Sequence, residues 1–217
     1  MLTMEFTYKS LTLEDLSQIE QLQQLVVKQL ADSTILQPLS QEELINILTG
    51  NGEMLGAYVD DVLVACRALL RPEVDEEEHL GVDAKATDLS RVIYQEVSFV
   101  NPSYRGHGLQ KKLGQRLMEN LSLQEYDVVC STVKPFNIPS LKDKFSQGLM
   151  VVALKLKYGG KLRYVFAKYL NEPVTFTGIK KSVEMANTAL QQELLDEGYY
   201  GTTLYEEQGV WYITYEK

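Results

Sequence analysis

The stretch from Asn101 to Leu109 contains the residues best suited to chemistry in this sequence. It reads Asn-Pro-Ser-Tyr-Arg-Gly-His-Gly-Leu and lies between an expected strand and an expected helix. Gly106 and Gly108 allow the backbone to approach a ligand closely, and the free N–H groups of a first helical turn lie at the positive end of the helix dipole. These features predict an anion site that a pyrophosphate would fit. The glycines alone leave open a second interpretation, a turn that merely starts a helix.

The residues around the two glycines make the pattern more specific. A strand, a Val-x-Pro-x-Tyr-Arg-Gly-x-Gly-Leu segment and a leucine-faced helix follow one another. The segment resembles the acetyl-CoA-binding motif of the GNAT acetyltransferase superfamily, usually written Gln/Arg-x-x-Gly-x-Gly/Ala. The residues that carry the resemblance are Val100, Pro102, Tyr104, Arg105, Gly106, Gly108 and Leu109. Gln110 stands at the last motif position, which requires more room beside the phosphates but leaves the backbone donors in place.

A second region resembles the same superfamily. Asn137, Ser140, Gly148 and Leu149 fit the order and spacing of its Asn-x-x-Ser... Gly-Phe segment. In the superfamily this Asn and the following helix approach the pantetheine arm and the adenosine half of the cofactor. The resemblance covers residues 3–170, and residues 158–163 are similar to a hairpin of poorly characterised bacterial members.

The resemblance implies that acetyl-CoA binds and that its acetyl group passes directly to a primary amine, without a covalent enzyme intermediate. Backbone groups of residues 98–100 would hold the pantetheine arm like an added strand. The amides of residues 105–110 would cradle the pyrophosphate. The predicted cofactor-binding residues are Ser98, Phe99, Val100, Arg105, Gly106, His107, Gly108, Leu109, Gln110, Lys111, Asn137 and Ser140.

Acetyl transfer to an amine requires a base, because an alkylamine with a pKa of about 10 is almost wholly protonated at neutral pH. Glu96 is the predicted base. It lies four residues before Val100, a position that resembles the catalytic glutamate of spermidine/spermine acetyltransferases. Alternation along a strand places Glu96 on the same face as Ser98. A surface carboxylate near a strand end is the alternative interpretation.

The sequence assigns no general acid. The superfamily often has a Tyr seven residues after the Asn, and this chain has Lys144 there. Lys144 could donate a proton, whereas an exposed Lys on a short polar helix is the alternative. Tyr94, Tyr104 and Tyr126 are further candidates, and a CoA thiolate can also leave without an acid. The missing Tyr leaves open a second function, an acyl-CoA-binding sensor that has lost its chemistry.

Charge and composition argue against several other function classes. Acidic residues exceed basic ones by nine, and no block of Lys and Arg interleaved with aromatics is present, which argues against nucleic-acid binding. Cys66, Cys130, His79 and His107 lack partners at metal-ligand spacing. We therefore expect buried reduced thiols and no metal. The acidic balance is compatible with a cationic amine substrate.

The predicted site residues must be positioned by the strands and helices of the fold, whose order can be read from capping boxes, a hairpin turn and hydrophobic periodicity. The predicted elements are a strand at 6–9, a helix from Thr12, a helix at 40–50, hairpin strands at 54–59 and 62–70, a loop at 73–90, a strand at 91–100, a helix at 105–121, a strand at 126–133, a helix at 141–147, and strands at 150–157 and 162–169. Some connections are too short for crossovers. The predicted class is α/β, with a GNAT-like mixed central β-sheet flanked by helices.

Residues 1–170 are predicted to form the acetyltransferase domain, and residues 171–217 a C-terminal α+β extension packed on the core. The extension is expected to contain a helix at 183–197 and a terminal hairpin, with Trp211, Tyr212 and Tyr215 buried. No repeat of 20–50 residues is visible. The extension could mediate a homodimer or cover the acceptor cleft.

The first ten residues, Met1–Ser10, match neither a signal peptide nor a membrane span. We therefore predict a cytoplasmic protein without membrane contact. Its expected partners are a small-molecule or peptide amine and a second copy of the chain.

Overall fold

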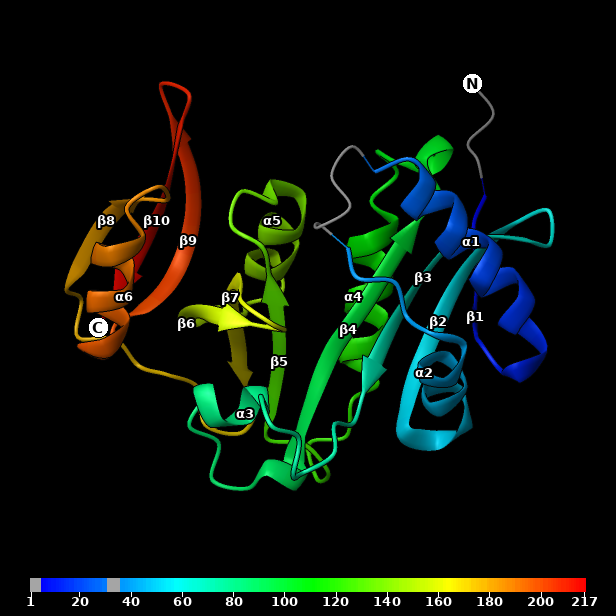
Figure 1. Ribbon diagram of the computed structural model, residues 1–217, viewed down its shortest axis with the longest axis horizontal. Helices are drawn as coiled ribbons and strands as arrows, with labels where there is room; N and C mark the ends of the chain where they lie inside the picture. Colours follow the sequence, from blue (N-terminus) through cyan, green and yellow to red (C-terminus); the bar gives the residue numbers. More distant parts are fainter. Residues whose placement is uncertain (1–4, 31–35) are drawn as a thin grey trace. The chain divides into compact units, whose positions relative to one another are not determined.

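A computed structural model describes residues 5–30 and 36–217 of the chain (Figure 1). Residues 1–4, part of the N-terminal segment discussed above, lie outside the described residues. The chain divides into two compact units, one of residues 1–71 with 94–121 and one of residues 72–93 with 122–217. Each unit combines antiparallel strands with helices packed against them.

The first unit has the strand order β1-β2-β3-β4, and neighbouring strands run antiparallel. The strands are β1 (Thr7–Ser10), β2 (Gly52–Val59), β3 (Val62–Leu70) and β4 (Val92–Val100), whose first two residues belong to the second unit. Asp60 and Asp61 join β2 to β3 with φ angles of 47° and 62°, as a tight two-residue turn requires. The predicted hairpin is therefore confirmed.

Capping boxes begin the first two helices, as predicted. Thr12 and Asp15 cap a 3-10 turn (Leu13–Asp15) that leads into α1 (Leu16–Lys28). Ser40 and Glu43 cap α2 (Gln41–Asn46), and the amide of Ser40 donates to Glu43 Oε2 at 2.6 Å. A π turn (Ile47–Asn51) then carries the chain into β2.

Helices cover both faces of the first sheet. One core cluster joins α1 and α2 to one face, and its members include Ile19, Leu22, Val26, Leu44, Ile47, Cys66, Ala68 and Phe99. A second cluster joins α4 (Leu109–Glu119) to the other face, with Ala57, Val64, Ala65, Leu109 and Leu113. Apolar residues at helical spacing therefore fix α4 against β2 and β3.

Helix α4 is shorter than the predicted helix at 105–121. Residues Pro102–Tyr104 form a 3-10 turn, the next four residues form a loop, and α4 begins only at Leu109. Gly106 and Gly108 have φ angles of 83° and 70°, which a right-handed helix does not contain. The glycines therefore belong to the loop and not to the helix.

The second unit has the strand order β5-β7-β6-β9-β10-β8, again antiparallel in every described pair. Its elements are α3 (Leu80–Asp83), a 3-10 turn (Leu89–Arg91), β5 (Val128–Val133), α5 (Ile138–Ser146), β6 (Met150–Lys157), β7 (Lys161–Tyr169), β8 (Lys180–Glu184), α6 (Thr188–Asp196), β9 (Tyr200–Glu207) and β10 (Val210–Glu216). Helices α5 and α6 share one core cluster with these strands.

Two predicted elements of this unit are wrong. The expected loop at 73–90 contains α3, whose first amides are capped by His79, because the amide of Gly81 donates to His79 Nδ1 at 3.0 Å. The expected helix at 183–197 is β8 followed by α6. Val183 and Met185 are buried and Glu184 is exposed, a strand period, and α6 starts only after Asn187.

The terminal hairpin is confirmed as β9 and β10. Tyr215 is fully buried, as expected, whereas Trp211 and Tyr212 are only half-buried. Tyr212 stacks on Tyr205 with the ring centres 5.3 Å apart, and Lys142 lies over the Trp211 ring at 4.9 Å. These two aromatic rings therefore gain contacts without full burial.

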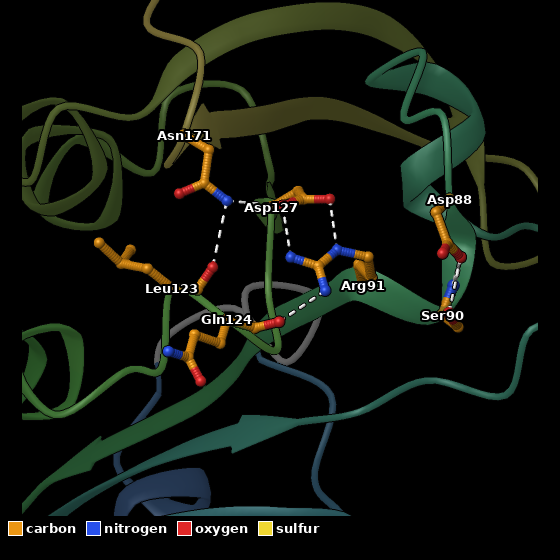
Figure 2. Close-up of polar contacts among 7 residues, drawn as sticks. All are labelled: Asp88, Ser90, Arg91, Leu123, Gln124, Asp127 and Asn171. Carbon is orange, nitrogen blue, oxygen red and sulfur yellow. Dashed lines mark hydrogen bonds and ion pairs between the residues drawn. The ribbon is translucent and has the colours of Figure 1, made fainter.

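A polar cluster within the second unit joins the segments before β4 and β5 to the end of β7 (Figure 2). Arg91 Nε and Nη2 donate to the carboxylate of Asp127 at 2.5 and 2.8 Å. Arg91 Nη1 also donates to the carbonyl of Gln124, and Asn171 donates to Asp127 Oδ1 at 2.6 Å. The hydrogen bonds from Arg91 and Asn171 lower the pKa of Asp127, so the carboxylate stays charged.

Candidate functional site

Strand β4 carries the predicted base at an irregularity of the sheet. Arg67 pairs with Ser98 and Leu69 with Gln95, so β4 has one more residue than β3 between these pairs. Glu96 lies in this β-bulge. Bulges bend a strand and re-aim side chains, and they are frequent next to active sites.

Side chains of β4 alternate beyond the bulge, as predicted. Glu96, Ser98 and Val100 are half-buried, whereas Val97 and Phe99 are buried. The Phe99 side chain belongs to the core cluster under α1 and α2, so only its backbone is left for a ligand. The hydroxyl of Ser98 is buried, and the structure gives it no hydrogen-bond partner among the described residues. Buried polar atoms are nearly always hydrogen-bonded, so a water or a bound ligand is the expected partner of this hydroxyl.

The loop after β4 is held by its own hydrogen bonds. The amide of Asn101 donates to the carbonyl of Val64 at 2.9 Å, and its side-chain oxygen accepts from the amide of Ser103 at 3.0 Å. His107 Nδ1 lies 3.1 Å from the carbonyl oxygens of Tyr104 and Arg105. The His107 side chain therefore turns back onto the loop, which leaves its amide as the group available to a ligand.

Backbone amides are open at the start of α4. Gly108 occupies the N-cap position and provides no side-chain cap. The first helical hydrogen bond runs from the amide of Lys112 to the carbonyl of Gly108 at 3.0 Å. Within the described part of the chain, the amides of residues 106–111 have no acceptor. The amide of Arg105 is different, because it donates to the carbonyl of Pro102 at 3.3 Å and does not belong to the cradle.

Space and charge around the loop both suit an anion. A Cβ atom added at Gly106 or Gly108 would meet no atom within 4 Å, so the loop is open on this side. Arg105 and Lys111 are exposed beside it. The open amides, the positive end of the helix dipole and these cations act together on any bound phosphate.

Arg67 is an additional positive group that the motif analysis does not include. Arg67 is only 1% exposed. Nη1 donates to the carbonyl of Gln110, in the first turn of α4, at 3.1 Å, and Nη2 donates to Gln95 Oε1 at 2.6 Å. An Arg inside the apolar run of residues 62–70 is the sequence signal that could have identified it, because Arg is almost never fully buried unless paired.

Helix α5 in the second unit also starts with an uncapped turn. Asn137 is its N-cap residue, and its side chain makes no capping hydrogen bond. The carbonyl of Asn137 accepts from the amide of Leu141 at 2.9 Å. Asn137 and Ser140 are both half-buried. The side-chain amide of Asn137 therefore keeps its donors and acceptor for another group.

Solved structures share the fold of this chain, although no protein-family model and no curated protein matches its sequence. The ribosomal-protein-S18-alanine N-acetyltransferase from Escherichia coli aligns with a TM-score of 0.57 at 14% identity, over 81% of this chain and 99% of its own. NAA60 from Arabidopsis thaliana in complex with acetyl-CoA gives 0.60 at 17% identity, over 77% and 100%. The NatC complex bound to Gag peptide and CoA gives 0.59 at 17% identity, over 77% and 100%. The chain has the GNAT fold.

The predicted class, α/β with a mixed central sheet flanked by helices, is confirmed by this likeness. Within the GNAT fold, the first unit brings together most of the predicted cofactor-binding residues, which run from Ser98 on β4 through the glycine loop to Lys111 on α4. Asn137 and Ser140 lie in the second unit, at the start of α5. The assignment of these residues to a cofactor stays a prediction.

Lys144 is buried, so the interpretation of an exposed Lys is wrong. Its side chain is 10% exposed, and Nζ lies 4.0 Å from Asp143 Oδ2. Tyr94 and Tyr126 are also buried, and Tyr104 is half-buried. Burial gives each of these groups a fixed position but does not select an acid among them.

Cys66 and Cys130 are buried and free, as predicted. Burial raises the pKa of Cys66 to about 12 and raises the pKa of Cys130 even further above its ordinary value. A neutral buried thiol neither attacks a thioester nor binds a metal. The described residues contain no cluster of His, Cys, Asp and Glu that could hold a metal ion, and none of their helices is long and apolar enough to cross a bilayer.

Proposed function

We propose that the chain is an acetyl-CoA-dependent N-acetyltransferase that acts on a primary amine. The open amides at the start of α4 support this proposal most strongly. A helix that begins at a left-handed Gly, without a side-chain cap, leaves its first donors for an external anion. The GNAT fold makes the diphosphate of coenzyme A the expected anion, because the similar NAA60 and NatC structures hold acetyl-CoA and CoA.

Features of β4 also fit the cofactor. The amides of residues 106–111 and the Arg105 and Lys111 side chains would hold the diphosphate. Backbone groups of residues 98–100 and the unpartnered Ser98 hydroxyl would hold the pantetheine arm. When bound, acetyl-CoA supplies an activated acetyl group as a thioester.

Glu96 is the proposed base. Glu96 lies in the β-bulge and is half-buried, so water can reach it. Glu96 would remove a proton from the ammonium group of the acceptor, directly or through one water, and leave a neutral amine. The amine nitrogen then forms the amide bond to the acetyl carbon, the carbon–sulfur bond breaks, and the thiolate leaves as CoA.

The acceptor class is a small-molecule or peptide amine. The E. coli neighbour is named for an alanine of ribosomal protein S18, and the NatC structure contains a peptide. The excess of nine acidic residues in this chain would attract such cationic amines. Loss of chemistry at the site, with retention of acyl-CoA binding, is the second candidate, because a buried Lys144 replaces the Tyr of the motif.

Calorimetric titration with acetyl-CoA tests the proposal. We expect micromolar affinity in the wild-type protein and a loss of at least tenfold in Gly108→Glu, whose carboxylate would fill the open space and repel the phosphates. Gly159→Glu is the matched control, because Gly159 also has a positive φ (75°) and open space but lies in the β6–β7 turn. Equal affinities in all three proteins would contradict the proposal. Release of CoA with an amine panel separates the enzyme from the sensor.

A further inference from the structure

The second unit contains a structural repeat with a period of 50 residues. Helices α5 and α6 both have nine residues, and strands β6 and β9 both have eight. Asn137 and Asn187 are the N-cap residues, with φ, ψ angles of −77°, 72° and −84°, 72°. Gly148 and Gly198 follow the two helices with φ angles of 76° and 87°. This repeat is not visible in the sequence.

Backbone hydrogen bonds also recur at the same period. The equivalent pairs are Asn137 N to Lys134 O (3.1 Å) with Asn187 N to Glu184 O (2.9 Å), Gly148 N to Phe145 O (3.0 Å) with Gly198 N to Leu195 O (3.0 Å), and Leu149 N to Lys144 O (3.1 Å) with Tyr199 N to Leu194 O (2.9 Å). Identical turns at both helix ends show that the likeness extends to single peptide groups.

Strand order and register repeat as well. The first copy has the order β5-β7-β6 and the second has β8-β10-β9, so the strand that comes last in sequence is central in both. The turn between β9 and β10 is one residue shorter than the turn between β6 and β7, so equivalent positions of β7 and β10 are 49 residues apart. With this shift the register is the same, because Val133 pairs with Tyr164 in the first copy and Val183 pairs with Ile213 in the second. A bulge follows Val151 in β6 and its equivalent Gly201 in β9. Two unrelated segments would have no reason to share the position of a bulge, so the shared position supports a repeat.

The sequence conceals the repeat because few side chains are shared. Identical equivalent positions include Val133 and Val183, Asn137 and Asn187, Gly148 and Gly198, Leu154 and Leu204, and Gly159 and Gly209. Most of these residues serve turns and caps, where backbone geometry restricts the choice of residue. Core and surface positions tolerate many substitutions, so equivalent positions of these kinds hold different residues in the two copies.

The two copies meet through β6 and β9. These strands are antiparallel, and Val151 lies opposite Gly201, its own equivalent. In a contact between two identical subunits related by a two-fold axis, residues equivalent by symmetry face each other at the axis. We propose that residues 180–217 are a second copy of the β5–β7 segment, which occupies, within the same chain, the edge of β6 that a second subunit would otherwise use.

Side chains at the junction fit this internal partner better than a second β6. A Cβ atom added at Gly201 would lie 2.9 Å from Val151 Cβ and 3.1 Å from Ile213 Cγ2. The missing side chain of Gly201 thus accommodates Val151. Two β6 strands paired in the same way would place Val151 against Val151. The junction is therefore specific for β9.

A buried polar cluster joins the copies a second time. Gln191 of α6 is fully buried, and its Oε1 accepts from Tyr164 of β7 at 2.7 Å and from Tyr215 of β10 at 2.9 Å. Its Nε2 donates to the carbonyl of Met185 at 2.8 Å. Gln192 Nε2 also donates to the carbonyl of Leu154 on β6 at 2.8 Å. Satisfied buried networks of this kind specify one arrangement of the parts that they connect.

The second copy serves as a partner and not as a second ligand site. Asn187 Oδ1 accepts from the amide of Leu190 at 3.2 Å, so Asn187 caps its own helix. Asn137, its equivalent, makes no such bond. The helix start that would face a ligand is thus open in the first copy and closed in the second.

Substitutions in the full chain test this inference independently of any acetyl transfer. Gly201→Val should lower hydrogen-exchange protection of the β6 and β9 amides at least tenfold and produce dimers or larger species in light scattering, because β6 loses its partner. Val151→Gly combined with Gly201→Val should restore much of the protection. Thr203→Val, on an exposed position of β9, is the matched control and should behave as wild type.

Light scattering and hydrogen exchange of the unmodified chain give a result even if Gly201→Val fails to fold. We expect the mass of one chain over a hundredfold range of concentration, with protected amides at the β6–β9 junction. A wild-type dimer whose contact lies on β6, or an unprotected junction, would overturn the inference. Unchanged protection in a folded Gly201→Val protein would also overturn it.

Discussion

Replacement of Arg67 by Met should both destabilise the fold and weaken cofactor binding. The guanidinium is buried and donates to Gln110 O and to Gln95 Oε1. Met has a similar length but no donors, so both acceptors lose these hydrogen bonds. The carbonyl of Gln110 lies within α4 and still accepts from the amide of Gly114, so Gln95 Oε1 is the buried acceptor that loses its donor. Loss of the donor to one buried acceptor predicts a decrease of about 1–3 kcal/mol in the free energy of unfolding.

A double variant separates the lost hydrogen bonds from the lost volume. Gln95→Leu removes the side-chain acceptor of Arg67 Nη2. In the Arg67→Met, Gln95→Leu protein the buried acceptor is removed together with its donor, so about 1–3 kcal/mol of the loss should be recovered relative to Arg67→Met. Urea unfolding monitored by far-UV circular dichroism measures all four proteins of this cycle.

Acetyl-CoA titration completes the test, because Arg67 donates to the carbonyl of Gln110 in the first turn of α4, next to the amides that would bind the diphosphate. Removal of this positive charge should weaken binding about tenfold, which corresponds to about 1.4 kcal/mol. Arg67→Lys keeps the charge but loses the fork, and it should retain more affinity than Arg67→Met. A loss of stability below about 0.5 kcal/mol in Arg67→Met, together with unchanged affinity, would refute the assigned role.

Two further predictions concern proton transfer and pH. Glu96→Gln should lower kcat about 10²- to 10⁴-fold and leave acetyl-CoA affinity unchanged, and equal kcat values in steady-state assays would exclude Glu96 as the base. Burial lowers the pKa of His79, an effect that the Lys157 charge reinforces and the Glu76 carboxylate opposes. The folded state therefore binds fewer protons there than the unfolded chain, and stability should fall as pH drops below about 6.5. His79→Asn keeps an acceptor for the amide of Gly81 and cannot titrate, so its urea midpoint should change less between pH 7.5 and 5.5; an equal change would contradict this.

Local chemistry explains which parts of the fold are predictable from the sequence. The capping boxes at Thr12 and Ser40 and the turn at Asp60 and Asp61 form because nearby side chains and backbone satisfy each other. The glycine loop is predictable for the same reason. The start of α4 is not predictable in this way. The composition of residues 105–108 is compatible with a helix, but the positive φ angles of Gly106 and Gly108 delay its start to Leu109.

Tertiary contacts decide the elements that the sequence pattern misassigns. Residues 183–187 have enough helix-forming neighbours to look helical, but Val183 and Met185 are buried in the core cluster of the second unit. Arg67 in the candidate site depends on contacts with residues 28 and 43 positions away. The hydrophobic periodicity of a short stretch of sequence contains no information on contacts between residues so far apart.

Helices α4 and α5, which the motifs assign to the cofactor, both begin without a side-chain cap, whereas α2, α3 and α6 each have one. Helix α1 also lacks a cap of its own, but it continues a 3-10 turn that Thr12 caps. A side-chain cap contributes about 1 kcal/mol, so the free chain forgoes this stabilisation at both positions. A ligand that supplies the missing acceptors would then stabilise the folded chain by mass action, with a gain that grows as RT ln(1 + [L]/Kd). Melting temperature should therefore report on the cofactor even when no acceptor substrate is known.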